Sequence, residues 1–229
     1  MFAKHLGKVV HAMPTVYAYR IMVDAGFAPC YDNDLFTLAC CKPIIRRTVG
    51  KKYMIGNYSR ENPVWITAIG GSAYKGHQND WIYVAKITDV VTYHEYFTNP
   101  KYRERKDCIY VIDNPKEFNG ISHMNLRVRH NGTSPYHTEP QNWTDDWNGK
   151  DECYVLISDE FAYFTHEESM MLTARFPQFM ASGRGHRVYE GSDVKELTDA
   201  FQILVNQGSK RTLSVDALSK MKEHQRRKC

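Results

Sequence analysis

The order of secondary-structure signals along the chain limits its fold more than any other feature. Strand-like apolar runs dominate the first two thirds of the 229 residues, and amphipathic helical patterns dominate the last third. This segregation, without a regular strand–helix alternation, is typical of an α+β fold. We therefore expect a curved mixed sheet or a small barrel with flanking helices, and C-terminal helices packed on it.

The expected strands are short apolar runs bounded by turn formers. They cover residues 15–23, 53–58, 64–69, 81–91 and 153–157, of which 81–91 is the clearest. The expected helices cover 93–97, 167–175, 192–207 and 214–227, with Ser192 as an N-cap. Residues 36–49 also look helical at their start, and Pro43 must begin a second helix or a kink there.

Composition indicates one intracellular domain with an ordinary core. Hydrophobic residues make up 42% of the chain and are spread along it, yet no run approaches the roughly 20 apolar residues of a membrane span. The N-terminus is not a convincing signal peptide. We expect a cytoplasmic protein. The domain is expected to cover 1–210, and a basic helical tail 211–229.

The cysteines do not form a metal-binding pattern. Six are present and no Cys-x-x-Cys pair occurs, so we expect free thiols and no metal; the sequence identifies no cofactor. His123, His130 and His137 recur at intervals of seven but lack a carboxylate partner pattern. The long polar segment 114–150 that holds them is of a length that is usually functional or disordered.

The net charge of +4 comes from the tail. Residues 220–228 contain five basic residues and one acidic residue, which accounts for the whole excess. The near-neutral body does not imply a strong, non-specific coat for DNA. The tail is interpreted either as a solvated helix end or as an extra attraction for phosphate.

Two early motifs point to a nucleotide. Asp24 and Phe27 follow the first predicted strand, and a carboxylate beside an aromatic ring suits a nucleobase. The run Thr37-Leu-Ala-Cys-Cys-Lys-Pro-Ile-Ile-Arg-Arg47 supplies three cations for a phosphate, Lys42, Arg46 and Arg47. Cys41 beside these cations is a candidate nucleophile. The alternatives are a turn shaped by Asp24 and a buried structural thiol.

Other motifs carry weaker signals. Gly71 and Ser72 are expected to offer backbone N–H groups to a phosphate, and His186 stands between two arginines as an anion ligand or acid–base group. The aromatic residues Tyr53, Tyr58, Trp65, Trp81 and Tyr83 form either a base-stacking pocket or ordinary core. There is no Walker loop, dinucleotide fingerprint or Gly-x-Ser-x-Gly elbow, so motors, dehydrogenases and α/β-hydrolases are disfavoured.

The chain resembles the second type of nucleotide modification associated domain, found in phages and bacteria. The matching segments span about residues 15–187 and include Asp24-Ala-Gly-Phe-Ala-Pro, Thr37 to Arg47, Gly70-Gly-Ser-Ala, 81–97, Lys106-Asp-Cys-Ile-Tyr110, 155–164 and Gly183-Arg-Gly-His186. The resemblance implies a base-modification context in nucleic acid, in the cytoplasm of a bacterial cell or an infected host, and leaves the reaction open. One departure is Gly50-Lys-Lys-Tyr53, where the family usually has Gly-Asp-aromatic.

A looser similarity links the chain to PUA-like domains of the EVE and YTH type, which seat a modified base in an aromatic pocket. Residues 53–59 and 81–86 would take the parts of their two marker strands. This similarity makes a PUA-like barrel the form expected if the sheet closes.

The leading hypothesis is a protein of a nucleic-acid base-modification pathway with a nucleotide pocket. Its expected partner is nucleic acid or a nucleotide, and other modification proteins are further candidate partners. No membrane partner is expected. Asp24 and Cys41 are its candidate catalytic residues. The residues expected to bind base or phosphate are Phe27, Lys42, Arg46, Arg47, Gly71, Ser72, Trp81, Asp107, Tyr110 and His186. The rivals are a non-catalytic reader with a cage around Trp65 and Trp81, and a scaffold anchored by Trp143 and Trp147.

Overall fold

The computed structural model describes residues 13–22, 26, 28–32, 34–74, 76–112, 126–128, 146, 153–180, 183 and 185–208. Within them the fold is α+β, as expected, with sheets of five and four strands and four α-helices. A third pair joins β7 (Tyr110–Ile112) to β8 (Leu126–Val128). Neither large sheet closes into a barrel in these ranges.

The first sheet has the order β10-β5-β4-β1-β11. Its strands are β1 (Thr15–Ile21), β4 (Val64–Gly70), β5 (Trp81–Lys86), β10 (Glu160–Tyr163) and β11 (His186–Tyr189). β1 and β4 run parallel and the other neighbours antiparallel, so the sheet is mixed, as the sequence indicated.

The second sheet is antiparallel throughout. Its order is β2 (Cys30–Asp32), β3 (Leu35–Leu38), β9 (Tyr154–Ser158) and β6 (Asp89–Thr92). The apolar run 81–91, expected as one strand, is divided between the two sheets. Ile87 and Thr88 form the passage from β5 to β6, because Thr88 N–H donates to the carbonyl of Ile157 in β9 while Ile87 N–H still bonds to Val64 in β4.

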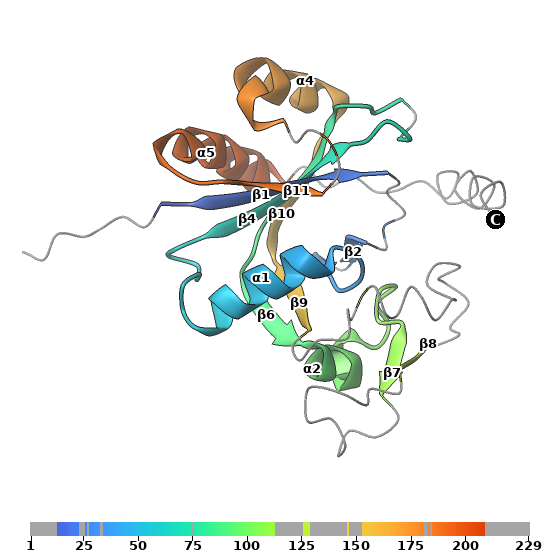
Figure 1. Cartoon of the computed structure of the whole chain (residues 1–229). Helices are drawn as coiled ribbons and strands as arrows, with labels where there is room; N and C mark the ends of the chain where they lie inside the picture. Colours follow the sequence, from blue (N-terminus) through green and yellow to red (C-terminus); the bar gives the residue numbers. More distant parts are fainter. Residues whose placement is uncertain are drawn as a thin grey trace, which may run out of the picture.

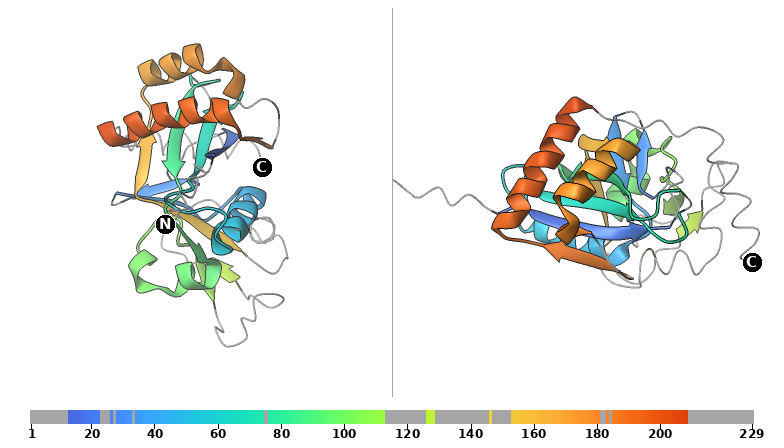
Figure 2. Two further views of the ribbon diagram at one scale, coloured as in Figure 1. Left: turned by 90° about the vertical axis from the view of Figure 1, so that its left-hand side faces the viewer. Right: turned by 90° about the horizontal axis from the view of Figure 1, so that it is seen from above.

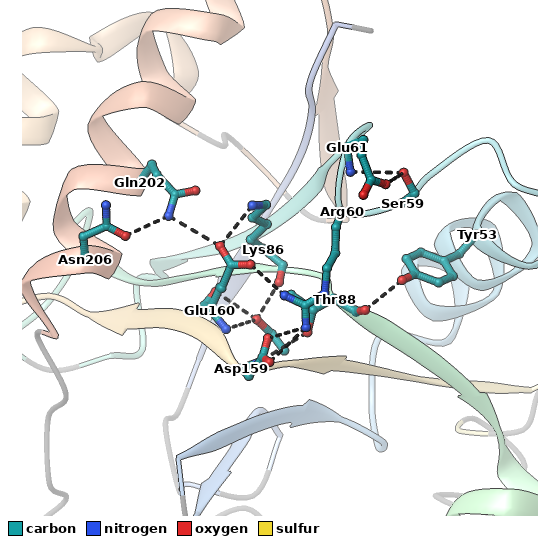
Figure 3. Close-up of polar contacts among 11 residues, drawn as sticks. Tyr53, Ser59, Arg60, Glu61, Lys86, Thr88, Asp159, Glu160, Gln202 and Asn206 are labelled. Atoms are coloured by element: carbon teal, nitrogen blue, oxygen red, sulfur yellow. Dashed lines mark hydrogen bonds and ion pairs between the residues drawn. The ribbon is translucent and has the colours of Figure 1, made fainter.

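A polar network ties this passage to the similar one between β9 and β10 (Figure 3). Arg60 contacts Asp159 at 2.9 Å and Glu160 at 3.0 Å, and Lys86 contacts Glu160 at 3.0 Å. Tyr53 OH donates to the carbonyl of Thr88 at 2.8 Å. Because these charges already pair with one another, we interpret the network as a clamp between the sheets.

Helices cover the two faces of the first sheet differently (Figures 1 and 2). α4 (His166–Arg175) and α5 (Ser192–Gln207) pack on one face, while α1 (Pro43–Met54) and the second sheet lie against the other. α2 (Tyr93–Thr98) belongs to a smaller cluster beyond the second sheet. The expected C-terminal helices at 167–175 and 192–207 are confirmed as α4 and α5, whereas the expected helix at 214–227 lies outside the described residues.

Three local expectations were wrong. Residues 35–38 form a strand, because both edges of this segment pair, with β2 and β9. Residues 53 and 54 are the last residues of α1, and the chain turns over 55–58. The helix is held in place because Gly50, on its buried face, packs closely against the ring of Tyr154. Ser192 is the first helical residue of α5, and Gly191 precedes it as the N-cap. Pro43 begins a helix, as expected.

The described part of the chain contains no helix long and apolar enough to cross a membrane.

Candidate functional site

The parallel strands β1 and β4 end at the same edge of the first sheet. Gly71 N–H donates to the carbonyl of Ile21 at 2.8 Å, which joins the two carboxyl ends. Arg20 bridges them as well, because its guanidinium donates to the carbonyl of Gly70 at 2.6 Å and to Asn79 at 2.8 Å. Carboxyl ends of adjacent parallel strands are common ligand sites in open sheets.

A strained corner approaches this edge from the start of α1. Cys41 and Lys42 both have left-handed backbone, with φ of 59° and 48°. Such conformations cost on the order of 1–3 kcal/mol per residue outside glycine and cluster at functional sites. The corner is held by contacts from Arg46, whose Nε donates to the carbonyl of Cys41 at 2.7 Å, and from Asp146, which accepts from the N–H of Cys41.

The guanidinium of Arg46 is already engaged in holding this corner. It is only 1% exposed and donates to the carbonyls of Tyr154 at 3.1 Å and Asp146 at 2.6 Å. It also lies over the ring of Tyr93, 5.0 Å from the centroid. We therefore do not place Arg46 on a phosphate, the role expected from sequence; its position makes it a support for the corner.

Lys42 projects from the corner onto the sheet. Its ammonium donates to the carbonyl of Arg20 at 3.2 Å and lies 4.6 Å from the centroid of the Tyr19 ring. The side chain is half-buried, and burial lowers the pKa of Lys42 below its ordinary value. The cation is thus fixed beside the carboxyl end of β1, with part of its surface open.

His186 opposes Tyr19, the ring under Lys42, in the pairing of β1 with β11. Its ring stacks on Tyr17, with centroids 5.9 Å apart and planes 29° from parallel. Burial lowers the pKa of His186, and the positive charges of Arg187 and Lys42 lower it further. Since like charges disfavour one another here, an anion bound between Lys42 and His186 would relieve the repulsion.

Aromatic rings continue inward from Lys42. The hydroxyls of Tyr19 and Tyr83 are 2.7 Å apart, and the ring of Tyr83 stacks on that of Tyr163 at 5.5 Å. The row ends at Tyr31, which is half-exposed and 4.2 Å from Tyr163. The row therefore runs from the cationic corner to the edge strand β2.

The remaining predicted residues in the interior do not face this site. Trp81 is 1% exposed on the opposite face, 5.6 Å from Phe201 of α5, and Trp65 is 2% exposed beside it. Asp107 is fully buried, accepting from Thr37 and Tyr96, and burial raises its pKa. None of these side chains is accessible to a base.

The other predicted residues divide into supporting and peripheral ones. Tyr110 OH donates to the Asp146 carboxylate at 2.7 Å, so it supports the Cys41 corner from within. Arg47 lies near Cys153, whose pKa it lowers against the larger effect of burial. Gly71 is buried with its N–H already bonded, whereas Ser72 is exposed. Asp24 and Phe27 lie outside the described residues.

Sequence reasoning missed Tyr17 and Tyr19 as site residues. The available signal was their i, i+2 spacing, which puts both on one face of β1, opposite Val16 and Ala18. Lys52, which contacts Tyr58, was also missed, because the segment around it was taken for a strand.

The described residues hold five cysteines in the thiol form, Cys30, Cys40, Cys41, Cys108 and Cys153, of which Cys41 and Cys153 are half-buried. Among the same residues there is no group of three or more His, Cys, Asp or Glu side chains suited to a metal ion.

The family model described as nucleotide modification associated domain 2 matches residues 13–222, most of the chain. The chain belongs to this family. The resemblance seen in the sequence is therefore confirmed, and with it an association with nucleotide modification; the looser PUA-like similarity is not. Searches of curated proteins and of solved structures gave no match. Cys41, Lys42 and His186 all fall within the family match.

Proposed function

We propose that this domain binds a phosphorylated nucleotide at the carboxyl ends of β1 and β4, within a pathway of nucleic-acid base modification. The observation that carries the proposal is the placement of Lys42 over Tyr19, the residue that His186 opposes in β11, beside the strained corner. The family supplies the nucleotide context.

The corner suits a phosphate for electrostatic reasons. The first turn of α1 contains no acidic residue, and no side chain caps its N-terminus. The positive end of the helix dipole therefore adds to the charge of Lys42. A dianionic phosphate placed there meets the Lys42 cation, the start of a helix and the His186 ring, whose protonation the phosphate would favour.

The base has two sources of recognition in this proposal. The half-exposed ring of Tyr31, at the end of the tyrosine row, offers a stacking surface. Asp24 and Phe27 directly follow β1 in the sequence, and we retain them as the pair that reads the base edge, with Ser72 at the rim.

Binding of dTMP, measured by calorimetry, tests this assignment. Lys42→Ala is expected to weaken binding at least tenfold, because it removes the fixed cation. Lys195→Ala is the matched control, since Lys195 is an exposed lysine on α5 paired with Asp199. Equal affinity of the wild type and the Lys42 variant would reject the site.

Whether the domain also changes the base is a separate question. Cys41 is half-buried next to Lys42 and remains the candidate nucleophile. Plain and modified DNA would be incubated with the protein, digested and analysed by mass spectrometry. A mass change that Cys41→Ala abolishes supports an enzyme, whereas retention of DNA without a mass change supports a reader.

A further inference from the structure

α1 is a strongly basic helix. Between Pro43 and Met54 it contains Arg46, Arg47, Lys51 and Lys52 and no acidic residue. Arg46 points into the interior and supports the corner described above, but Lys51 is exposed and Lys52 is half-buried. The helix thus presents positive charge well beyond the candidate phosphate site.

A continuous line of side chains joins the two ends of α1 along β1 and β11. At one end, Lys42 lies over Tyr19 and influences His186. His186 stacks on Tyr17, and the neighbouring Tyr58 adds to the effect of burial in raising the pKa of Tyr17. At the other end, the ammonium of Lys52 donates to Tyr58 OH at 3.3 Å and lies 5.4 Å from its ring centroid.

The length of this line exceeds one phosphate group. Lys42 and Lys52 are ten residues apart, which corresponds to about 15 Å along a helix. No single phosphate contacts both, whereas successive phosphates of a polynucleotide strand do. The rings of Tyr17, Tyr19 and Tyr58 are buried beneath this line, so what it offers to a strand is its cations, which attract the phosphates of a polynucleotide.

The acids near α1 lie on its other flank or at the end of the line. Tyr53, from the last turn of α1, is surrounded by Asp89, Glu61 and Asp159, which raise its pKa after the larger effect of burial. On the β11 side, Glu190 lies near Tyr17 and is 3.5 Å from the hydroxyl of Thr15. Asp159 already pairs with Arg60, whereas Lys52 projects toward Tyr58.

We infer that the ligand is a single-stranded polynucleotide whose backbone follows α1 from Lys42 to Lys51 and Lys52. This inference rests on the proposed function, because Lys42 is taken as the contact for the phosphate of the recognised nucleotide. A single strand fits better than a duplex, because its base reaches the protein without the cost of unstacking and unpairing.

Fluorescence anisotropy with labelled oligo(dT) of increasing length tests the inference. Wild-type affinity is expected to rise at least tenfold from dTMP to an octamer. The double change Lys51→Glu, Lys52→Glu is expected to remove this gain and leave dTMP affinity within twofold. The logarithmic salt slope for the octamer should fall by about 0.7 for each phosphate that the variant no longer binds. Lys195→Glu on α5 is the control for added negative charge.

The outcomes separate the two proposals. Absence of dTMP binding by the wild type rejects the proposed site. Intact dTMP binding with no gain from the octamer, or octamer binding unchanged in the double variant, overturns the strand-binding surface alone. Tighter binding of a duplex of equal length overturns the choice of a single strand. Lys52→Gln keeps a donor for Tyr58 and should weaken octamer binding in the same direction, which excludes misfolding as the cause.

Discussion

The two faces of the first sheet are built from the same strands but differ in chemistry. Toward α4 and α5, β1 presents Val16 and Ala18, which pack in an apolar cluster with Trp65, Trp81 and Phe201. Toward α1 and the second sheet, the same strand presents Tyr17 and Tyr19, whose hydroxyls require partners. The first face provides burial alone. The second combines burial with polar groups that open onto the cationic corner, and this is the face to which we assign function.

The largest expected effect comes from the apolar face. The ring of Phe201 packs against those of Trp65, Trp81 and Phe164, with ring centroids 6.0, 5.6 and 6.2 Å apart. Phe201→Ala should destabilise the fold by about 3–5 kcal/mol, because it leaves a cavity among large rings. Denaturant unfolding measures this loss. If the two faces have separate roles, the folded variant keeps its dTMP affinity; a parallel loss of affinity would break the comparison.

A smaller effect is expected on the tyrosine face. Tyr19→Phe removes the hydrogen bond to Tyr83 OH and should cost about 1–2 kcal/mol, because a buried hydroxyl loses its partner. Adding Tyr83→Phe should then cost less than it does in the wild type, since the two hydroxyls act as a pair. A double-mutant cycle by denaturant unfolding measures this coupling. Strict additivity of the two changes would show that the hydroxyl pair is not a stabilising unit.

The smallest effect is a pH dependence at the corner. The pKa of His186 is lowered in the folded state, so between that value and the ordinary value of about 6.5 the unfolded chain binds more protons. The contribution of His186 to stability is therefore lost as pH falls below about 6.5. The change is small because the ring is half-exposed. Thermal unfolding at pH 5.5 and 7.5 should show a smaller difference for His186→Gln than for the wild type.

Inorganic phosphate provides the matching control for His186. By neutralising the neighbouring cations, it should reduce the difference between the two pH values in the wild type only. A difference that is the same in the wild type and in His186→Gln would exclude His186 as its source.

The sequence predicts those elements whose signals are local. The apolar runs at 15–23 and 64–69 and the amphipathic pattern at 192–207 were placed correctly, because burial on one or both faces dictates them. The pairing of residues 35–38 with β9 depends on a segment more than a hundred residues away, so the helical appearance of 36–49 misled at its start. Pro43 marked the true beginning of α1.

The candidate site was predictable in part for the same reason. Lys42 and His186 were singled out from local motifs, and the structure places both at Tyr19, Lys42 over its ring and His186 opposite it in β11. Arg46, four residues after Lys42 in the same motif, was expected to take the same role. Its side chain instead points into the interior toward Asp146. Which cations face outward depends on the left-handed corner at Cys41, and no residue type at that position announces such backbone geometry.

The parallel pairing of β1 with β4 has a consequence for how the protein is assembled. The connection between them, residues 22–63, contains β2, β3 and α1, so the corner that carries Lys42 lies inside the crossover. Closing such a long connection is slow, because its entropy is lost before the pairing is gained. Lys42 lies within this connection, so we expect ligand affinity to appear late in folding, after the crossover has closed.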